Sequence, residues 1–508
     1  MSNARENVNL LTSTDWDVAT LRLANWGSGA VPPQVVLKTN YVAGDGGGVF
    51  RYDASDTTTA DDGGIVIVDA AGNRWKRQWD ENNAQASWWG ATASVSADQS
   101  AKIQAGIDWL EARDRGGILL LPPGTVRIDS TLTVERNNIT ILGQGGDQPH
   151  DAGTGARAAT ILAWYGASGG GSAMVFFRTP SGIGNSRRYG GGFKRTQMDC
   201  RTLADYGLRI ESWAYAEWHN LDVFSPRVGA YWLTCLVTGT TIAEAGDVQR
   251  NDFWACTWRC IDNATTKLAH GFILDGSSNA NTSLNIFRSC VGQHFDGTGW
   301  LMFNCDNNLL MQCGSFRASG GTGYTFRFKG QSPTAYGGGY SNTLLHCGWS
   351  ASNGCYVEGT DVAGNTAGPS PPNTFLSTDN ANGSQFPTYG TGAAQGIITF
   401  DNTSMAGMRQ INAPFGESAS AATNARTAIA ATDSVYIVNG SQSHLVLSDG
   451  TNVWSLRLTA TTFDILRVAG TAKLNLPAVT ALQINGQDVS LGAADSGGTG
   501  FKLLRVPN

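Results

Sequence analysis

The chain has 508 residues and a mass of 53.7 kDa, which is too long for one ordinary domain. Apolar residues make up 41%, so the chain can bury a large core and is not a disordered protein. A net charge of −6 with only 15% charged residues gives no basic footprint for binding nucleic acid. The 64 glycines and 16 tryptophans are typical of a β-rich protein with many turns and with aromatic surfaces for sugars or partners.

The N-terminus and the cysteines indicate the cellular compartment in which the chain folds. Residues Met1–Asn7 are polar and lack the apolar core of a signal peptide. No apolar run approaches the roughly 18–20 residues of a membrane span, so we expect no membrane insertion. All nine cysteines lie between Cys200 and Cys355, and in a cytosolic product we expect them to be reduced and buried. Their spacing matches no zinc site, so no metal and no other cofactor is expected.

The first elements along the chain are a hairpin and a helix. The run Gly44–Gly48 lacks the Lys and Ser/Thr of a phosphate-binding loop, and a hairpin turn between Tyr41-Val42 and Val49–Tyr52 fits it better. A helix is expected at about 98–115, capped by Asp98 and ended by Gly116-Gly117, with Ile103, Ile107 and Leu110 on its apolar face. Four strand-like runs follow it: Ile118–Leu121, Thr125–Ile128, Leu132–Val134 and Ile139–Leu142.

The middle of the chain repeats a motif of Asn, any residue, Phe or Leu, two residues and Cys. Its copies are Asn251–Cys256, Asn285–Cys290, Asn308–Cys313, Asn342–Cys347 and a degraded Asn373–Thr378. Such short units cannot bury their own apolar face, so successive copies must stack about 4.8 Å apart as parallel strands. In that stack the asparagines can hydrogen-bond to each other at the turns, and the cysteines can lie above one another inside.

A second motif, Gly followed by apolar residues at alternate positions, alternates with the first. Its copies begin at Gly207, Gly229, Gly271, Gly299, Gly323 and Gly354. Alternation of this kind is typical of strands. If the first and third residues after Gly face inward, the second and fourth face outward. From about residue 413 the cysteines disappear, and alternating strands are expected at Val435–Val438, His444–Leu447, Val453–Leu458 and Phe463–Val468.

Several segments resemble one known family. Segments 98–108, 116–125 and 139–143 look like the start of pectate-lyase-like right-handed parallel β-helices, as in bacteriophage tailspikes and capsule depolymerases. The sequence departs from the usual pattern at Pro122-Pro123 and at Val126, where tyrosine is common. Segments 41–53, 61–65 and 74–75 resemble a small module that precedes tailspike β-helices, and residues 497–508 resemble phage tail termini. The fold alone does not reveal the chemistry.

The resemblance implies an all-β protein with a right-handed parallel β-helix, a small N-terminal β module and a C-terminal β-rich module, assembled as a homotrimer. Residues 1–85 would attach to a phage tail or baseplate protein, 86–412 would form the β-helix with its capping helix, and 413–508 would hold the trimer together. The implied location is the virion tail. The implied partner is bacterial surface polysaccharide: capsule, exopolysaccharide or O-antigen.

Cleavage of such a glycan by hydrolysis needs two carboxyl groups. Glu211 and Asp275 hold the fourth position after Gly in their repeats, so both should face outward, two coils and about 9.6 Å apart. That spacing is near the inverting range of about 6.5–9.5 Å. Glu217, Asp222 and Asp247 are further candidate catalytic acids.

Candidate sugar-binding residues are Tyr231, Trp254, Trp258, Arg288 and Tyr356. The outward Tyr231 and Tyr356, with Leu301 and Phe303, could equally form a trimer interface. A polysaccharide lyase is the second hypothesis, with a base and a cation drawn from the following set: Arg209, Arg259, Arg288, Arg317, His294, His346 or a tyrosine. No dense acidic cluster for calcium is present, so hydrolysis ranks first. A non-catalytic glycan-binding adhesin is the third hypothesis.

Overall fold

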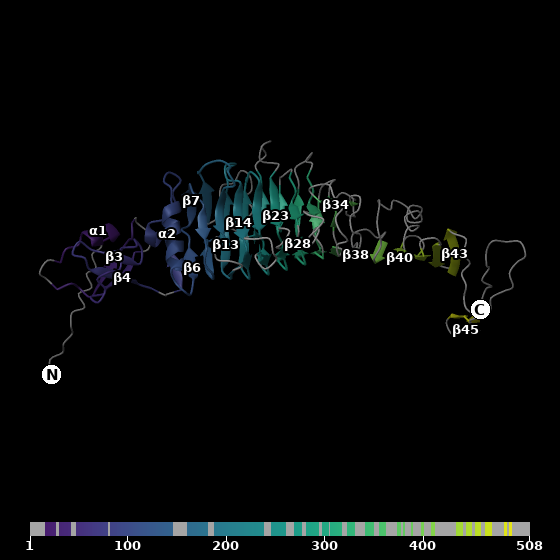
Figure 1. The fold of residues 1–508 in the computed structure, drawn as a ribbon, viewed down its shortest axis with the longest axis horizontal. Coiled ribbons are helices and arrows are strands. Elements are labelled where there is room, and N and C mark those ends of the chain that lie inside the picture. The colour runs from purple at the N-terminus through teal and green to yellow at the C-terminus, as the bar shows by residue number, and fades with distance from the viewer. Residues whose placement is uncertain are drawn as a thin grey trace, which may run out of the picture.

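The computed structural model describes residues 16–489 with gaps. The described ranges are 16–26, 30–41, 47–79, 82–145, 160–180, 187–237, 245–260, 269–276, 281–293, 297–303, 305–316, 323–330 and 341–349, with strand segments between 355 and 489. These residues form a small module at one end and a long stack of coils (Figure 1). None of the helices in these ranges is long and apolar enough to cross a membrane.

The N-terminal module is one helix against a four-stranded antiparallel sheet in the order β1-β2-β4-β3. The helix α1 spans Val18–Leu23, and the strands are β1 Gln34–Leu37, β2 Gly48–Tyr52, β3 Val66–Val68 and β4 Arg74–Gln78. Its core gathers Val18, Leu21, Val35, Leu37, Phe50, Ile67 and Trp75, all nearly inaccessible to solvent. β2 contains the predicted second strand Val49–Tyr52, but the strand that pairs with it is β1, which lies before the expected Tyr41-Val42; residues 42–46 lie outside the described residues.

A parallel β-helix follows, built from three sheets along which each coil pairs with the next. The large sheet begins with β5 Asn83–Gln85, β6 Gly117–Leu120, β7 Gly124–Ile128, β9 Ile139–Leu142, β10 Thr160–Trp164, β13 Gly192–Asp199 and β16 Glu217–Phe224. It then takes two strands from each coil: β21 Asp252–Trp254 with β22 Thr257–Arg259, β25 Ile286–Arg288 with β26 Val291–Gln293, β29 Leu309–Met311 with β30 Gly314–Phe316, β32 Thr343–Leu345 with β33 Gly348–Trp349, and β35 Thr374–Leu376 with β36 Asp379–Asn380.

The other two sheets complete each coil. In the described part of the chain the nine-stranded sheet holds β8 Leu132–Val134, β11 Ala173–Phe177, β14 Tyr206–Glu211, β17 Gly229–Thr234, β23 His270–Asp275, β27 Trp300–Phe303, β31 Phe326–Gly330, β34 Cys355–Asp361 and β37 Thr388–Tyr389. The five-stranded sheet holds β12 Arg188–Tyr189, β15 Trp213–Ala214, β20 Val248–Gln249, β24 Thr282–Ser283 and β28 Cys305–Asp306. The predicted all-β parallel β-helix is confirmed.

The repeated asparagines form the predicted ladder. The side-chain Oδ1 of Asn285 accepts from the backbone N–H of Asn251 at 3.1 Å and from its Nδ2 at 3.0 Å. The same two bonds join Asn285 to Asn308, Asn308 to Asn342, and Asn342 to Asn373, all at 2.9–3.0 Å. Because these side chains are almost fully buried, the ladder satisfies polar groups that would otherwise be costly.

A column of left-handed residues bends each coil within the large sheet. The fifth residue of the motif has a positive φ in Ala255, Ser289, Gln312 and His346. The bend separates the two strands that each of these coils contributes. His346 is therefore an exposed turn residue, as expected from its place in the repeat.

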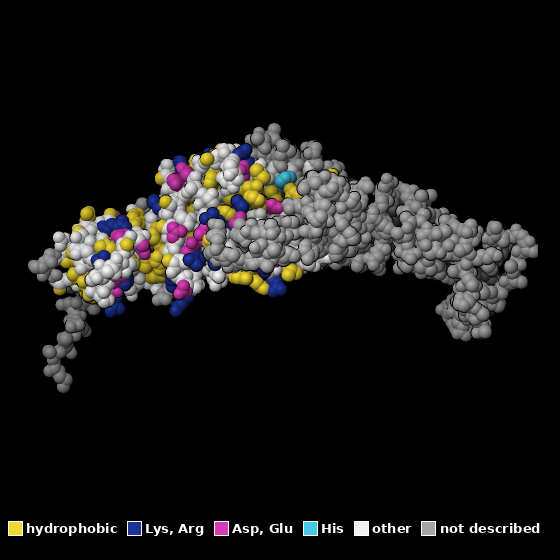
Figure 2. Space-filling view, in the orientation of Figure 1, with side chains coloured by type: hydrophobic (Ala, Val, Ile, Leu, Met, Phe, Trp, Pro, Cys, Tyr) yellow, Lys and Arg dark blue, Asp and Glu magenta, His cyan; other side chains and the backbone are white. Residues whose placement is uncertain are grey.

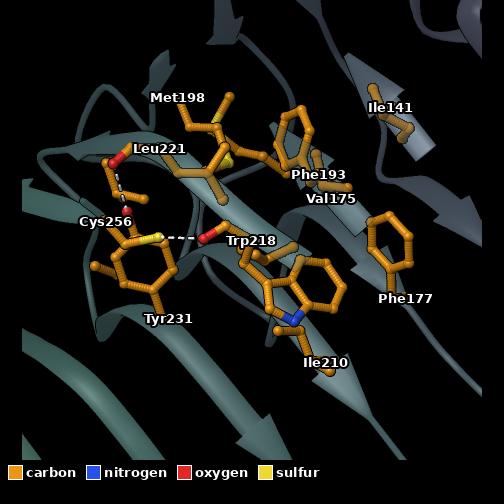
Figure 3. Packing of buried hydrophobic residues seen from close by; sticks show 14 of the residues in the cluster. Ile141, Val175, Phe177, Phe193, Met198, Ile210, Trp218, Leu221, Tyr231 and Cys256 are labelled. Carbon is orange, nitrogen blue, oxygen red and sulfur yellow. Dashed lines mark hydrogen bonds between the residues drawn. The ribbon is translucent and has the colours of Figure 1, made fainter. Parts of the chain in front are cut away.

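The interior of the β-helix is apolar and aromatic. Phe272 and Trp300 stack with ring centroids 4.3 Å apart, and Tyr231 stacks on Phe272 at 4.4 Å. Figure 3 shows Tyr231 and Cys256 inside this core, where the tyrosine hydroxyl donates to the carbonyl of Leu221 at 3.1 Å and the thiol to that of Trp218 at 3.0 Å. All nine cysteines are free, and eight are buried, as predicted.

The capping helix α2 spans Ser100–Glu111 and covers the first coil, with Ile103, Ile107 and Leu110 fully buried (Figure 1). Gln99 is its N-cap residue, yet Asp98 still accepts the backbone N–H of Ser100 at 2.9 Å. The short 3-10 helix η1, Ala86–Trp89, precedes it.

Beyond β38, Ile398–Phe400, strand pairing changes from parallel to antiparallel. The strands are β39 Met408–Ile411, β40 Asp433–Asn439, β41 Ser443–Asp449, β42 Val453–Leu458 and β43 Phe463–Ala469. All four C-terminal strands expected from the sequence are present. The short hairpins β18–β19, Leu236–Val237 with Ala245–Gly246, and β44–β45, Leu482–Ile484 with Gln487–Val489, stand apart from the three sheets.

Candidate functional site

The candidate site lies on the outer face of the nine-stranded sheet. The pairing register of the strands decides which side chains lie on this face. Tyr206, not Gly207, pairs with Gly229, so the repeat slips by one residue between β14 and β17. Tyr231 and Leu233 therefore face the core, and Trp232 and Thr234 face outward. Tyr231 has no exposed surface, so the prediction that it faces outward is wrong.

One outward column carries the two predicted carboxylates. Glu211 pairs with Thr234, and Thr234 pairs with Asp275, so the two acids lie two rungs apart. At about 4.8 Å per rung their strands are about 9.6 Å apart. This is the arrangement expected from the alternation of the sequence.

Two charged residues precede Glu211 in the same column. Phe177 pairs with Ile210 on one side and with Val134 on the other, so Arg178 lies between Glu211 and Glu135. Arg178 forms an ion pair with Glu135. The column thus reads acid, base, acid along three successive rungs.

Arg209 holds Glu211 from the same strand. Its Nη2 lies 3.0 Å from the Glu211 Oε2, with both side chains largely covered. The guanidinium stands between two aromatic rings, 4.4 Å from the ring centroid of Phe176 and 4.2 Å from that of Trp232. Stacking on both faces fixes the guanidinium, so the carboxylate that it holds is also fixed.

Trp232 links the two acids. It occupies the strand between β14 and β23, and its Nε1 donates to the Asp275 Oδ2 at 3.4 Å. Tyr206 stacks on its ring, with centroids 4.6 Å apart. The result is a partly exposed aromatic surface between Glu211 and Asp275.

Burial sets the ionisation of Glu211. It raises the pKa of this carboxyl above its usual value, while the positive charges of Arg209 and Arg178 oppose the rise. A carboxyl group that keeps its proton more readily can serve as a general acid. Figure 2 shows acidic, basic and hydrophobic side chains mixed over the described part of the β-helix that faces the viewer.

The other three predicted acids lie elsewhere. Glu217 is exposed on the large sheet and is ion-paired with Lys194. Asp222 is on the same strand, only 3% exposed, and accepts the hydroxyl of Thr257 at 2.8 Å. Asp247 adjoins the five-stranded sheet, 2.8 Å from the Arg187 Nη2. None of the three lies on the nine-stranded sheet that carries Glu211 and Asp275.

Of the predicted sugar-binding residues in the described part of the chain, only Trp254 and Arg288 are brought together. Trp258 is 1% exposed and packs edge-on to Trp300 at 5.9 Å, so it belongs to the core and cannot contact a glycan. Trp254 and Arg288 are exposed neighbours on the large sheet, paired in register. The side chain of Tyr356 lies outside the described residues.

Sequence reasoning missed four residues of this surface: Glu135, Phe176, Arg178 and Trp232. The sequence repeat assigned Trp232 to the interior because it aligned Gly229 with Gly207, whereas the strands pair Gly229 with Tyr206. The other three lie before the regular repeats. Phe176 is in β11, and Glu135 and Arg178 directly follow β8 and β11, so only the pairing register of these strands shows that they belong to this surface. No group of three or more His, Cys, Asp or Glu side chains with the geometry to hold a metal occurs in the described part of the chain.

Comparisons with known proteins give one family match and several distant structures. Residues 17–80 match the model of the phage tail protein small four-stranded beta-sheet domain. A tailspike of Acinetobacter phage vb_AbaP_AS12 is 13% identical with a TM-score of 0.47, and the match covers 97% of this chain and 98% of that one. The glycan biofilm modifying enzyme of Pantoea stewartii, with a tailspike-like parallel β-helix, is 12% identical with a TM-score of 0.44, covering 89% and 69%. A protein of Geobacillus virus E2 is 14% identical with a TM-score of 0.43, covering 87% and 84%.

The family match agrees with the structure. The four-stranded sheet β1-β2-β4-β3 lies wholly within the matched range. The chain thus carries a phage tail domain, followed by a parallel β-helix. The predicted order of a small N-terminal β module and a parallel β-helix is confirmed.

Proposed function

We propose that this chain is a phage tailspike that binds and depolymerises bacterial surface polysaccharide by glycoside hydrolysis. The observation that supports it best is the outward column of the nine-stranded sheet, with Glu211 and Asp275 two rungs apart. A strand separation of about 9.6 Å is close to the separation of about 6.5–9.5 Å that leaves room for a water in inverting glycosidases.

Each residue of the surface has a role in this proposal. Glu211 is the general acid, because its raised pKa keeps a proton for the departing sugar oxygen. Asp275 is the general base that activates water from the other side of the scissile bond. Trp232, on the strand between them, presents the partly exposed part of its indole beside Asp275, where a sugar ring can make apolar contact.

The rest of the assembly is proposed on the same footing. We propose that residues 1–85 attach to a tail or baseplate protein, that 86–412 hold the glycan-cleaving β-helix, and that 413–508 hold a homotrimer together. Tyr189, Tyr215 and Leu284 lie on or directly after strands of the five-stranded sheet, and Ile286 begins β25 of the large sheet; their exposed apolar side chains favour self-association. Light scattering measures the mass of the assembly.

The test is cleavage of surface polysaccharides from a panel of Gram-negative bacteria by the full chain and two variants. Glu211→Gln and Asp275→Asn should each lower the cleavage rate by about 10²–10⁴-fold, since each removes an acid–base group, while glycan binding persists. Glu217→Gln is the matched control, because its carboxylate lies on another sheet and should not matter.

Mass spectrometry of the products separates the hypotheses. Hydrolysis gives fragments heavier by one water, whereas a lyase gives unsaturated fragments with new ultraviolet absorbance. Unsaturated products, or full activity in both variants, would remove the two-carboxylate proposal. Binding without any cleavage by the unaltered chain would instead favour an adhesin.

A further inference from the structure

Arg178 stands between two carboxylates but is bound to only one of them. The column runs Glu135, Arg178, Glu211 at successive rungs: Glu135 directly follows β8, Arg178 directly follows β11, and Glu211 ends β14. Both Nε and Nη2 of Arg178 engage the Glu135 Oε1. Its second neighbour, Glu211, is held by Arg209 instead. One cation is thus placed within a rung of two competing acids.

The charged groups around Glu211 are few in the described residues. Arg209 faces it from its own strand, and Arg178 from the residue that follows β11. On the other side β17 contributes the uncharged Thr234, and Asp275 lies one rung further. Burial raises the pKa of Glu211, and the two arginines lower it. Any movement of Arg178 therefore acts directly on this carboxyl.

We infer that Glu135 is a positioning residue that holds Arg178 away from Glu211 and thereby sets the pH range in which Glu211 carries a proton. Without the Glu135 carboxylate, the guanidinium keeps its charge, because arginine does not lose its proton in proteins. The nearest remaining acid in the column is then Glu211. A close positive charge lowers a carboxyl pKa by about 1–3 units, so Glu211 would ionise at lower pH.

The catalytic meaning of this inference rests on the proposed function, but its test does not. The protonation of Glu211 can be followed in the full chain by carbodiimide coupling of glycine ethyl ester at a series of pH values, because the protonated carboxyl is the reactive form. Peptide mass spectrometry then gives the extent of labelling at Glu211 alone, whether or not any glycan is cleaved.

For Glu135→Gln we expect the pH midpoint of Glu211 labelling to fall by about one unit, which is about a tenfold lower yield at pH values well above the original midpoint. Arg178→Gln should move the midpoint upward, since it removes a positive charge. Glu135→Asp, which keeps a carboxylate, should restore much of the original midpoint. Asp53→Asn, in the N-terminal module, is the charge control and should change nothing.

A midpoint of Glu211 that stays unchanged in Glu135→Gln would overturn the inference. If the unaltered chain cleaves a polysaccharide, the alkaline limb of its pH–rate profile should shift to lower pH in Glu135→Gln, by the same amount as the labelling. If the labelling midpoint shifts while no substrate is cleaved, the positioning role of Glu135 is supported, and only the proposed hydrolase function is contradicted.

Discussion

His270 is a residue whose charge state the fold controls. Burial, together with the positive charge of Arg327, lowers its pKa from 6.5 to about 4. Its Nδ1 accepts the N–H of Thr298 at 3.0 Å, a bond that only the neutral ring can make. The unfolded chain takes up this proton first as the pH falls. The contribution of the neutral His270 to the free energy of unfolding is therefore fully present above about pH 6.5 and is lost as the pH falls toward 4.

Replacing His270 by asparagine removes the titrating group and keeps an acceptor for Thr298. We expect the free energy of unfolding of the wild-type chain to fall by roughly 1–2 kcal/mol between neutral and mildly acidic pH. The His270→Asn chain should not show this loss. Thermal melting at the two pH values measures this difference. His346→Asn is the control, because His346 is exposed at a turn with φ of 51°, which asparagine tolerates. An equal acid sensitivity in His270→Asn would contradict the assignment.

At this scale the sequence predicted the acids better than the aromatics. Glu211 and Asp275 were placed correctly because their own repeats align, with Gly207 and Gly271 at equivalent rungs. Tyr231 was not, because a slip of one residue reverses which side of a strand faces the core. Trp258 lies on β22, outside the glycine repeat, so no alternation predicted the side of its strand on which the ring lies. Both rings are large enough to fill the interior, and nothing in the local sequence distinguishes a core aromatic from a sugar platform.

The asparagine ladder is the element that most directly joins coil to coil. Asn308, which is 1% exposed, donates to the carbonyl of Thr282 at 2.9 Å and to Asn342 at 2.9 Å, and accepts two bonds from Asn285. Asn308→Ala would leave several buried polar groups unsatisfied. We expect a loss of roughly 3–5 kcal/mol in unfolding free energy. Denaturant unfolding measures it.

The neighbouring residue supplies the control. Asn307 is exposed with φ of 53°, so Asn307→Gly should cost little or stabilise slightly. An Asn308→Ala chain as stable as this control would show that the ladder is incidental.

The ladder was predictable because the motif recurs in register. The left-handed bend was not, because Ala255, Ser289 and His346 share no residue type that signals a positive φ.

At the scale of the whole molecule, the module and the β-helix are joined through a shared core. Ile65 and Val66, from the module, pack in the core cluster of the β-helix. Gly64 lies against the indole of Trp89, where an added Cβ would be 2.6 Å from the ring. β5 already pairs with β6 from Asn83 onward. The sequence indicated two separate units meeting near residue 85, because composition shows where a pattern changes and not which side chains cross the boundary.

Arg77 joins the two parts. It is 4% exposed, donates to the carbonyls of Gly64 at 2.9 Å and Gly47 at 2.6 Å, and also donates to the Asn40 side chain. Its guanidinium stands 4.5 Å from the ring centroid of Phe50 in the module and 4.6 Å from that of Trp88 at the start of the β-helix. One buried cation therefore contacts both cores.

Arg77→Met keeps the apolar stem and removes the donors and the charge, so three buried acceptors lose this partner. We expect the module to be destabilised by about 2–4 kcal/mol relative to the β-helix. Hydrogen exchange should then rise across residues 17–80 while the asparagine ladder stays protected. Arg74→Met, on the same strand but with a guanidinium that bonds only the solvent-exposed carbonyls of Thr59 and Gly72 among the described residues, should leave the exchange unchanged. If both variants exchange alike, the module is held by its apolar contacts alone, and its junction with the β-helix does not depend on Arg77.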